Sequence, residues 1–422
     1  MLDIKFIREN PEKVKKGAKN KGVKVDVDRL LEVDKNRREL LSQIESLRAE
    51  QNKLSKPFAA KGKPVKGEDA IKKAAELKRK VKGLEERFKL LDEEFDELMA
   101  QVPNLPFDDV PVGKDEADNK VLRKEGKVPK FAFNIKDHLE LGEGLDIIDV
   151  KRASKVAGSR FAYLKGEAVW LWFALVRLAF ETLREKGFRA LLPPVMIKPE
   201  MAWAMGYLEQ TDDEDAYFLE KDKLYLVATS EQTIGAMHAG EAFEEKDLPK
   251  RYFGFSTCFR REAGAYGKDT RGIIRQHQFD KIEMFSFTKP KESEKEHELM
   301  LSIEEELMGA LALPYQVVNI CTGDLGRPAV KKYDIETWMP SQNKYRETHS
   351  TSNCTDFQSR RLNIRYKDKK ANKLEFVHTL NGTAFAQRPL IAVLENFQQK
   401  DGSVKIPKAL HKHLPFKEIK RK

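Results

Sequence analysis

The chain has 422 residues, of which 40% are hydrophobic and 35% charged. This length exceeds that of one typical domain, so we expect two or three. Its net charge of +10 suits a polyanionic partner such as a nucleic acid. Three cysteines without zinc-site spacing indicate reduced thiols rather than a disulfide framework. No signal-peptide-like run follows Met1, and arginines at 177 and 184 interrupt the most apolar stretch. We therefore expect a cytoplasmic protein without a membrane segment.

Residues 1–101 are predicted to form a helical N-terminal domain. Apolar residues recur at alternating intervals of three and four from Leu30 to Leu54, and again from Ala70 to Leu98. This spacing is that of a coiled-coil seam. The two runs are separated by a Lys-, Pro- and Gly-rich break at 56–67. Two such helices joined by a turn fold back as an antiparallel arm.

Lysines gather near the predicted tip of this arm, and a cationic tip suits a phosphate backbone. They are Lys53, Lys56, Lys61, Lys63, Lys66, Lys72 and Lys73. Solvated lysines are common on helices, and heptads are also typical of a dimerising coiled coil. The pattern alone therefore leaves RNA binding and dimerisation as alternatives.

The proline-rich start of residues 102–135 predicts a linker, and residues 136–422 a second domain. We expect a long helix over 166–186, followed by short strands bounded by Gly, Asp and Pro. Because strands and helices do not alternate regularly, an α+β domain with a largely antiparallel sheet and flanking helices is expected. No P-loop or Rossmann glycine motif occurs, which disfavours the other common nucleotide-binding folds. The basic tail after Pro415 is expected to be unstructured or to contact RNA.

The most informative segment is 259–283. It contains a pair of arginines beside a glutamate, a glycine-bearing loop, and a return strand with Phe279 and Glu283. The planar fork of arginine matches carboxylate and phosphate groups, which must meet when a carboxylic acid is adenylated. An Arg/Glu salt bridge on a surface hairpin is the plain structural alternative. The whole pattern resembles motif 2 of the class II aminoacyl-tRNA synthetases, and most closely that of the seryl-tRNA synthetase family.

Two further segments resemble that family. Thr229-Ser230-Glu231 follows a predicted strand, where the family has Thr-x-Glu facing the amino acid's ammonium group; alone, such a triplet is usually a helix cap. The segment from Glu347 to Asn353 resembles one whose Glu and Ser hold magnesium. A histidine stands there in place of a serine. A zinc site would need a second His or Cys at ligand spacing, which the sequence lacks.

The segment 381–388 resembles motif 3, whose arginine meets the γ-phosphate side of ATP. Pro389 is expected at the first position of the following helix, where its missing N–H costs nothing. One residue fewer than usual separates Asn381 from Arg388, so the register of this motif is open. The segment 187–194 resembles motif 1, which implies a homodimer interface.

The resemblance implies specific roles for these residues. The catalytic residues would be Arg260, Glu262 and Arg388. Serine would be bound by Thr229, Ser230, Glu231, Arg260, Glu283 and Thr383. ATP would be bound by Arg260, Arg261, Glu262, Phe279, Glu347, Thr348, His349, Ser350 and Arg388. Magnesium would be held by Glu347 and Ser350.

The resemblance covers nearly the whole chain and implies an enzyme that uses ATP and Mg²⁺. It would activate L-serine to seryl-adenylate, release pyrophosphate, and transfer serine to the 3′ end of tRNA(Ser) held by the arm. Charging of tRNA(Sec) is left open. Two alternatives remain: a synthetase-like paralogue that activates another small amino acid or loads a carrier protein, and a non-catalytic RNA-binding protein.

Overall fold

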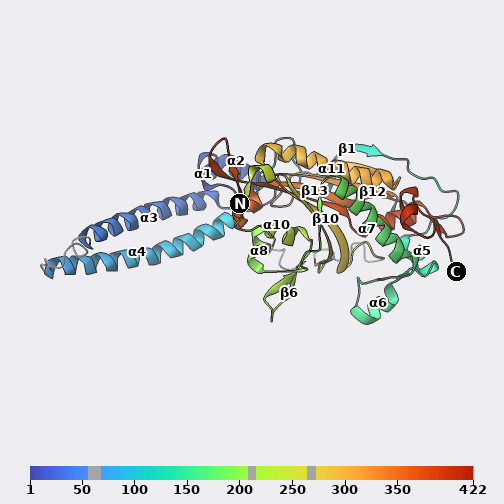
Figure 1. Cartoon of the computed structure of the whole chain (residues 1–422), viewed down its shortest axis with the longest axis horizontal. Helices are drawn as coiled ribbons and strands as arrows, with labels where there is room; N and C mark the ends of the chain where they lie inside the picture. The colour runs from blue at the N-terminus through green and yellow to red at the C-terminus, as the bar shows by residue number, and fades with distance from the viewer. Residues whose placement is uncertain (56–67, 208–214, 264–271, 422) are drawn as a thin grey trace. The chain divides into compact units, whose positions relative to one another are not determined.

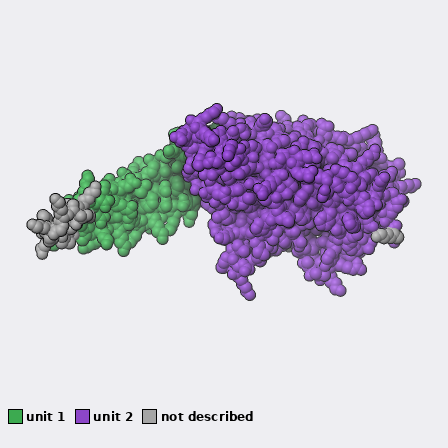
Figure 2. Space-filling model, viewed as in Figure 1, with its two compact units in different colours: residues 1–103 green, residues 104–422 purple. Residues whose placement is uncertain are grey.

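The computed structural model describes residues 1–55, 68–207, 215–263 and 272–421 (Figure 1). The chain divides into two compact units, Met1–Pro103 and Asn104–Lys422 (Figure 2). The predicted break at 56–67, with Lys56, Lys61, Lys63 and Lys66, lies outside the described residues. Within the described ranges, no helix is long and apolar enough to span a membrane.

The first unit is helical, with α1 (Ile4–Glu9), α2 (Pro11–Asn20), α3 (Val27–Ser55) and α4 (Glu68–Gln101). Helices α3 and α4 pack along each other as the predicted coiled-coil arm (Figure 1). Leu40 and Ile44 of α3 and Val81 of α4 are buried in the seam. Full burial of such a side chain contributes about 1.5–3 kcal/mol. The heptad prediction is therefore confirmed.

One heptad position of the arm carries a charge rather than an apolar side chain. The Arg37 guanidinium lies 4.5 Å from the ring centre of Phe95 and 5.5 Å from that of Phe88. It also forms an ion pair with Asp92 of the opposite helix. These contacts combine cation–π attraction with charge neutralisation, so the seam tolerates the arginine.

The second unit is built on an eight-stranded sheet in the order β1-β11-β12-β13-β16-β10-β9-β4. All neighbours are antiparallel except β4 and β9, which run parallel. The strands are β1 (Lys120–Glu125), β4 (Arg189–Leu191), β9 (Lys250–Phe259), β10 (Gln278–Thr288), β11 (Tyr315–Asn319), β12 (Lys331–Met339), β13 (Lys344–Thr355) and β16 (His378–Phe385). This arrangement confirms the predicted α+β class.

Strand β1 falls inside the segment 102–135 that was predicted to be a linker. It pairs with β11 from Lys120 to Glu125 and forms the edge of the sheet. Part of that segment is therefore integral to the second unit. The domain boundaries themselves stay a prediction.

The longer helices that pack on the sheet are α7 (Glu167–Glu185), α11 (Ser293–Ala310) and α13 (Arg388–Asn396). Helix α7 matches the predicted helix over 166–186. Its residues Leu171, Leu175 and Ala179 recur every four positions and are fully buried, as expected for an amphipathic helix on a core. The apolar cluster continues through α11, α13 and the sheet.

Glu304 of α11 is a charged residue type inside this apolar layer. It is fully buried, and neither carboxyl oxygen has a hydrogen-bond partner among the described residues. Burial and the nearby carboxylates raise its pKa well above the ordinary value. Its surroundings therefore favour the neutral, protonated form of Glu304.

Smaller elements surround the sheet. The helices are α5 (His138–Gly144), α6 (Val150–Ala157), α8 (Pro199–Ala204), α10 (Glu231–Ala236) and α12 (Phe357–Leu362). The strands are β2 (Ile148–Asp149), β3 (Tyr163–Leu164), β5 (Met196–Ile197), β6 (Tyr217–Leu219), β7 (Leu224–Leu226), β8 (Ala242–Glu244), β14 (Arg365–Asp368), β15 (Lys373–Phe376), β17 (Val404–Lys405) and β18 (Glu418–Ile419). Because β18 pairs with β17, the basic tail after Pro415 is ordered there, not unstructured.

Candidate active site

The segment 259–283 forms the predicted hairpin. Strands β9 and β10 are paired from Phe259↔Gln278 inward. Successive side chains of a strand alternate between its two faces. Phe279, Lys281 and Glu283 therefore share one face of β10, while Ile282 contributes to the apolar core. Arg271, at the end of the connecting loop, lies outside the described residues.

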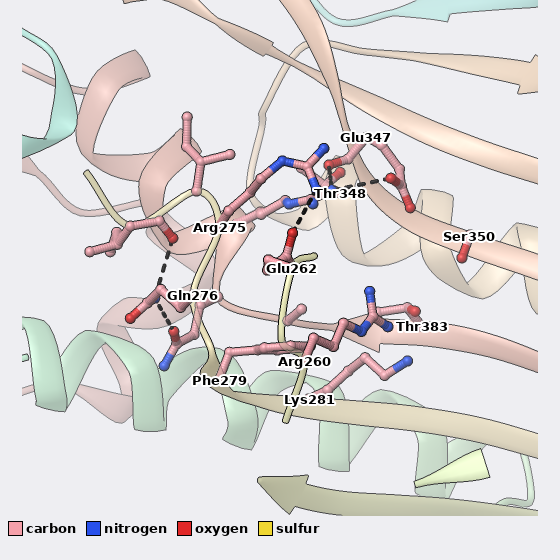
Figure 3. A pocket seen from close by; sticks show the side chains of 15 residues that line it. Arg260, Glu262, Arg275, Gln276, Phe279, Lys281, Glu347, Thr348, Ser350 and Thr383 are labelled. Carbon is pink, nitrogen blue, oxygen red and sulfur yellow. Dashed lines mark hydrogen bonds and ion pairs between the residues drawn. The ribbon is translucent and has the colours of Figure 1, made fainter. Parts of the chain in front are cut away.

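A pocket opens beside this hairpin (Figure 3). Eight of the predicted site residues line it: Arg260, Glu262, Phe279, Glu347, Thr348, Ser350, Thr383 and Arg388. Its remaining lining comes from Ile273, Ile274, Arg275, Gln276, Lys281, Ala386 and Gln387. Segments more than a hundred residues apart thus meet at one polar, strongly charged cavity.

Arg388 links two walls of the pocket. Its Nη1 atom donates to the backbone oxygen of Glu347 at 2.8 Å and to the Glu347 Oε2 atom at 3.2 Å. The Glu347 side chain is 46% exposed, and the positive charges of Arg388, Lys332 and Arg260 hold its pKa at about 2. Helix α13 begins at Arg388, so Pro389 occupies its second position rather than the predicted first. The alignment of segment 381–388 with motif 3 selected Arg388 as the motif's arginine, and Arg388 lies in the pocket.

Arg260 and Glu262 hold fixed positions at the base of the hairpin. The Arg260 guanidinium lies 5.3 Å from the ring centre of Phe279 and donates through Nε to the Ala228 carbonyl at 3.3 Å. The Glu262 carboxylate accepts a hydrogen bond from Arg275 at 2.9 Å. Glu262 has a φ of +57°, a conformation that non-glycine residues rarely adopt. Such strain is often found at functional sites.

Of the residues predicted to bind serine, Arg260 and Thr383 line the pocket, whereas Thr229, Ser230, Glu231 and Glu283 are not among its lining residues. Thr229, Ser230 and Glu231 are buried at the start of α10, and Ser230 makes no side-chain cap hydrogen bond. The Thr229 hydroxyl, however, accepts a hydrogen bond from the backbone N–H of Glu231 at 3.3 Å, so a capping role of this triplet is supported through Thr229. Glu283 is 1% exposed and accepts hydrogen bonds from Lys281 at 2.7 Å and from the Thr383 hydroxyl at 3.1 Å.

Two predicted ATP-binding residues do not line the pocket. Arg261 is exposed, and its guanidinium lies 5.5 Å from the ring centre of Tyr217. His349 is 1% exposed, packs against Phe385, and bonds through Nδ1 to the Thr348 hydroxyl at 2.9 Å. Burial lowers the His349 pKa to about 3, so the ring is neutral. The positions of Arg261 and His349 do not support the predicted ATP contacts.

The structure also reveals site residues that the motif comparison did not select. Lys281 lines the pocket and bonds Glu283, and Gln276 bonds Gln387 across it at 2.8 Å. Strand alternation from Phe279 could have found Lys281, because residues two apart share a face. Gln276 and Gln387 lie within the motif-like segments 259–283 and 381–388, but their contact with each other depends on tertiary folding.

The predicted magnesium ligands stand close together on one strand. Glu347 and Ser350 of β13 both line the pocket, and Asp334 of β12 is the register partner of Ser350. Asp334 is buried, which raises its pKa to about 7 despite an ion pair with Lys332 at 3.2 Å. Carboxylate and hydroxyl oxygens fit magnesium, which takes few protein ligands when substrate phosphates supply the rest. No cluster of three or more metal-binding side chains was found in the described part of the chain.

Comparison with known proteins identifies the family. The model of the seryl-tRNA synthetase N-terminal domain matches residues 1–106, and that of the tRNA synthetase class II core domain (G, H, P, S and T) matches residues 217–397. The serine–tRNA ligase of Dictyoglomus turgidum is 44% identical over 426 residues, covering 100% of both chains. The chain belongs to the seryl-tRNA synthetase family.

Solved structures of family members agree over the full length. The seryl-tRNA synthetase of Pyrococcus horikoshii complexed with ATP is 43% identical, with a TM-score of 0.92 and 100% coverage of both chains. The cytoplasmic serine–tRNA ligase of Naegleria fowleri in complex with AMP is 34% identical, with a TM-score of 0.89 and coverage of 100% and 99%. The family fold thus extends to the arm and the catalytic half alike.

Proposed function

We propose that this protein is a serine–tRNA ligase, which activates L-serine with ATP and transfers it to tRNA(Ser). The observation that carries the proposal is the pocket itself, in which Arg260 and Arg388 of two separate motifs stand beside Glu347, a carboxylate of the kind that holds magnesium. A non-catalytic RNA-binding protein would have no need of this arrangement. The full-length match to serine–tRNA ligases supports the same activity.

In the proposed first step, Arg260 binds the carboxylate of serine and the α-phosphate of ATP. Its fork can serve both anions, and its contact with the Ala228 carbonyl fixes its direction. Holding the serine carboxylate in line with the α-phosphorus allows it to attack and expel pyrophosphate. Positioning and charge stabilisation carry this step, since it requires no covalent bond to the protein.

Adenine would stack near Phe279, and Arg388 would neutralise the outer phosphates. Glu347 and Ser350 would hold Mg²⁺, which when bound supplies positive charge to the triphosphate. The Arg388–Glu347 ion pair at 3.2 Å supports a position of both groups beside the same phosphates. Glu262 and Thr348 complete this wall of the ATP site.

Serine would be recognised through all three of its polar groups. Thr229 and Glu231 would bind the ammonium group, while Glu283 and Thr383 would bind the hydroxyl. Ser230 would shape the wall behind them, since its side chain is fully buried. A site built to bond a hydroxyl rejects alanine strongly, because the missing group leaves buried polar atoms unpaired.

The arm, residues 1–101, is proposed to bind the tRNA, with residues 102–135 and 136–422 as the linker and catalytic domain predicted above.

The family also implies a homodimer in the cytoplasm. Exposed apolar side chains support the dimer: Trp170 and Phe173 of α7 are 58% and 56% exposed, and Leu192 after β4 is 82% exposed. Sedimentation equilibrium should give twice the mass of 48.6 kDa.

The deciding experiment is ATP–pyrophosphate exchange without tRNA, using serine, threonine, alanine, glycine and cysteine in turn. Exchange should be strongest with serine, and Arg260→Ala should lower it by at least about tenfold, or about 1.4 kcal/mol. Arg123→Ala is the matched control, because Arg123 pairs with Glu305 and does not line the pocket. Strongest exchange with another amino acid would favour the paralogue, and no exchange from folded protein would refute the ligase.

A further inference from the structure

Helix α10 contacts both β9 and β10, and a glycine of β9 stands at the point of contact. A Cβ atom on Gly254 would lie 2.7 Å from the Cδ1 atom of Ile234 and 3.2 Å from the Cγ atom of Pro193. Non-bonded carbon atoms pack best at about 3.5–4.0 Å, so this position leaves no room for a side chain. The Ser230 hydroxyl donates to the Gly254 carbonyl oxygen at 3.5 Å. Glycine at 254 therefore permits α10 to lie directly on the strand.

A second glycine at this contact belongs to the helix itself. Gly235 of α10 faces Met205, the residue that ends α8, and Phe285 of β10. A Cβ atom on Gly235 would lie 2.5 Å from the Met205 Sδ atom and 2.9 Å from the Phe285 Cζ atom. Met205 and Phe285 are both fully buried, and a densely packed interior gives them little space to move into. One glycine in the strand and one in the helix thus permit the close approach of α10 to the sheet.

The close contact lies beside the residues proposed to bind serine. Gly254 is the register partner of Glu283, so the two positions share one face of the sheet. The Glu283 carboxylate accepts a hydrogen bond from the Thr383 hydroxyl at 3.1 Å. Helix α10 begins at Glu231, one turn before Gly235, so Glu231 and Gly235 share one face of the helix. The groups proposed for the ammonium and for the hydroxyl of serine are therefore carried by two elements, and the glycine contacts fix the separation of those elements.

We propose that Gly254 and Gly235 are specificity-determining positions, because the close approach of α10 leaves too little room for the extra methyl group of threonine. This inference rests on the proposed function and deepens it. Serine carries its ammonium group on one carbon and its hydroxyl on the next, so α10 and the sheet hold it from two sides. Threonine has a methyl group on the carbon that bears the hydroxyl, and this methyl group needs space in the same gap. Neither glycine has to touch the substrate, since each acts through the position of α10.

Displacement of the whole helix is the expected response to a side chain at position 254. Ile234 is 1% exposed, and its branched Cβ restricts its χ1 rotamers in a helix. Its end therefore cannot turn aside without disturbing the residues packed around it. The rigid ring of Pro193 stands on the other side of the added methyl group. A methyl group at 254 should therefore move α10 away from the sheet and widen the proposed serine site.

The test compares pyrophosphate exchange with serine and with threonine in Gly254→Ala. One methylene group in a pocket changes the ratio of two kcat/KM values by about 10- to 200-fold, so the preference for serine over threonine should fall by at least about tenfold. The KM for ATP should stay nearly unchanged, because neither Gly254 nor Gly235 lines the pocket. Gly235→Ala should act in the same direction from the helix side. Gly309→Ala in α11 is the matched control, because a Cβ atom there would meet no atom within 4 Å.

A rescue experiment separates this role from a general loss of stability. Gly254→Ala is combined with Ile234→Val, which deletes the Cδ1 atom that the new methyl group would meet, and the double variant should regain the serine preference of the wild type. Urea unfolding shows which variants are folded, and Gly235→Ala carries the same test if Gly254→Ala does not fold. An unchanged preference for serine in the folded alanine variants, or a reduced preference that Ile234→Val does not restore, would overturn the inference while leaving the ligase intact. A lack of any serine-dependent exchange by the wild type would instead refute the proposed function.

Discussion

The neutral carboxyl of Glu304 gives a stability prediction that depends on pH. In the folded protein the group keeps its proton, because it is fully buried and its oxygens find no partner among the described residues. In the unfolded chain it titrates near its ordinary value of 4.5. The folded state therefore binds more protons above that pH, and stability falls as pH rises until the folded pKa is reached. Glu304→Met should remove this loss.

The magnitude follows from the pH interval over which only the folded state is protonated. Each pH unit above 4.5 costs about 1.4 kcal/mol while the proton is retained. The advantage of the methionine variant should thus be larger at about pH 8 than at about pH 6, because it grows for as long as only the folded state keeps the proton. Methionine has a similar length and a flexible side chain, so it should fill the space without a large packing penalty.

The assay is urea unfolding at both pH values, followed by fluorescence of the buried Trp172 in the same core. Glu305→Met is the matched control, because that neighbouring carboxylate is paired with Arg123 and Tyr315. The control should gain no stability at either pH. If Glu304→Met were less stable than the wild type at the higher pH, or if its advantage were the same at both, the argument from burial would be wrong.

Three further predictions address the site and the arm. Arg388→Ala removes the contact to Glu347 and should reduce pyrophosphate exchange by about a hundredfold (about 2.7 kcal/mol). Binding of tRNA, measured by filter binding, should be retained. Loss of exchange and of tRNA binding together would argue against a local role. The His349 pKa is lowered to about 3, so in acid the folded state binds fewer protons than the unfolded chain. Stability should therefore fall as pH drops below about 6.5. Thermal melts of His349→Phe should show a smaller fall in melting temperature with acid than the wild type. Ile44→Ala in the arm should cost about 2–5 kcal/mol locally and lower the melting temperature seen by circular dichroism. It should impair tRNA charging and spare exchange, and equal loss of both would show that the arm also supports the catalytic half.

The sequence predicted those features that depend on periodicity and on motif spacing. The heptads from Leu30 and Ala70 located both arm helices, and the apolar spacing in 166–186 located α7. The resemblance to family motifs brought together Arg260, Glu347 and Arg388, although no local rule places residues so distant in sequence in one pocket.

Other features could not be predicted from the sequence, because they depend on the local backbone or on tertiary packing. His349 lies among predicted ATP ligands, yet the irregular register of β13 near Glu347 turns its ring to the core. Arg261 neighbours Arg260, but β9 ends at Phe259, so strand alternation does not place the Arg261 side chain. The burial of Glu304 near other carboxylates comes from tertiary packing, so the sequence of α11 alone suggests only another solvent-exposed acid.

The short edge strand β1 limits where the catalytic half could be separated from the rest of the chain. All five residues of β11 are buried, and its outer backbone is covered only by β1 within the described sheet. A fragment beginning at residue 136 would uncover that apolar strand and leave its amide and carbonyl groups open. Such an edge is a template for pairing with other chains, so this fragment should self-associate. A fragment beginning at residue 104 keeps its own protective strand and should remain dispersed.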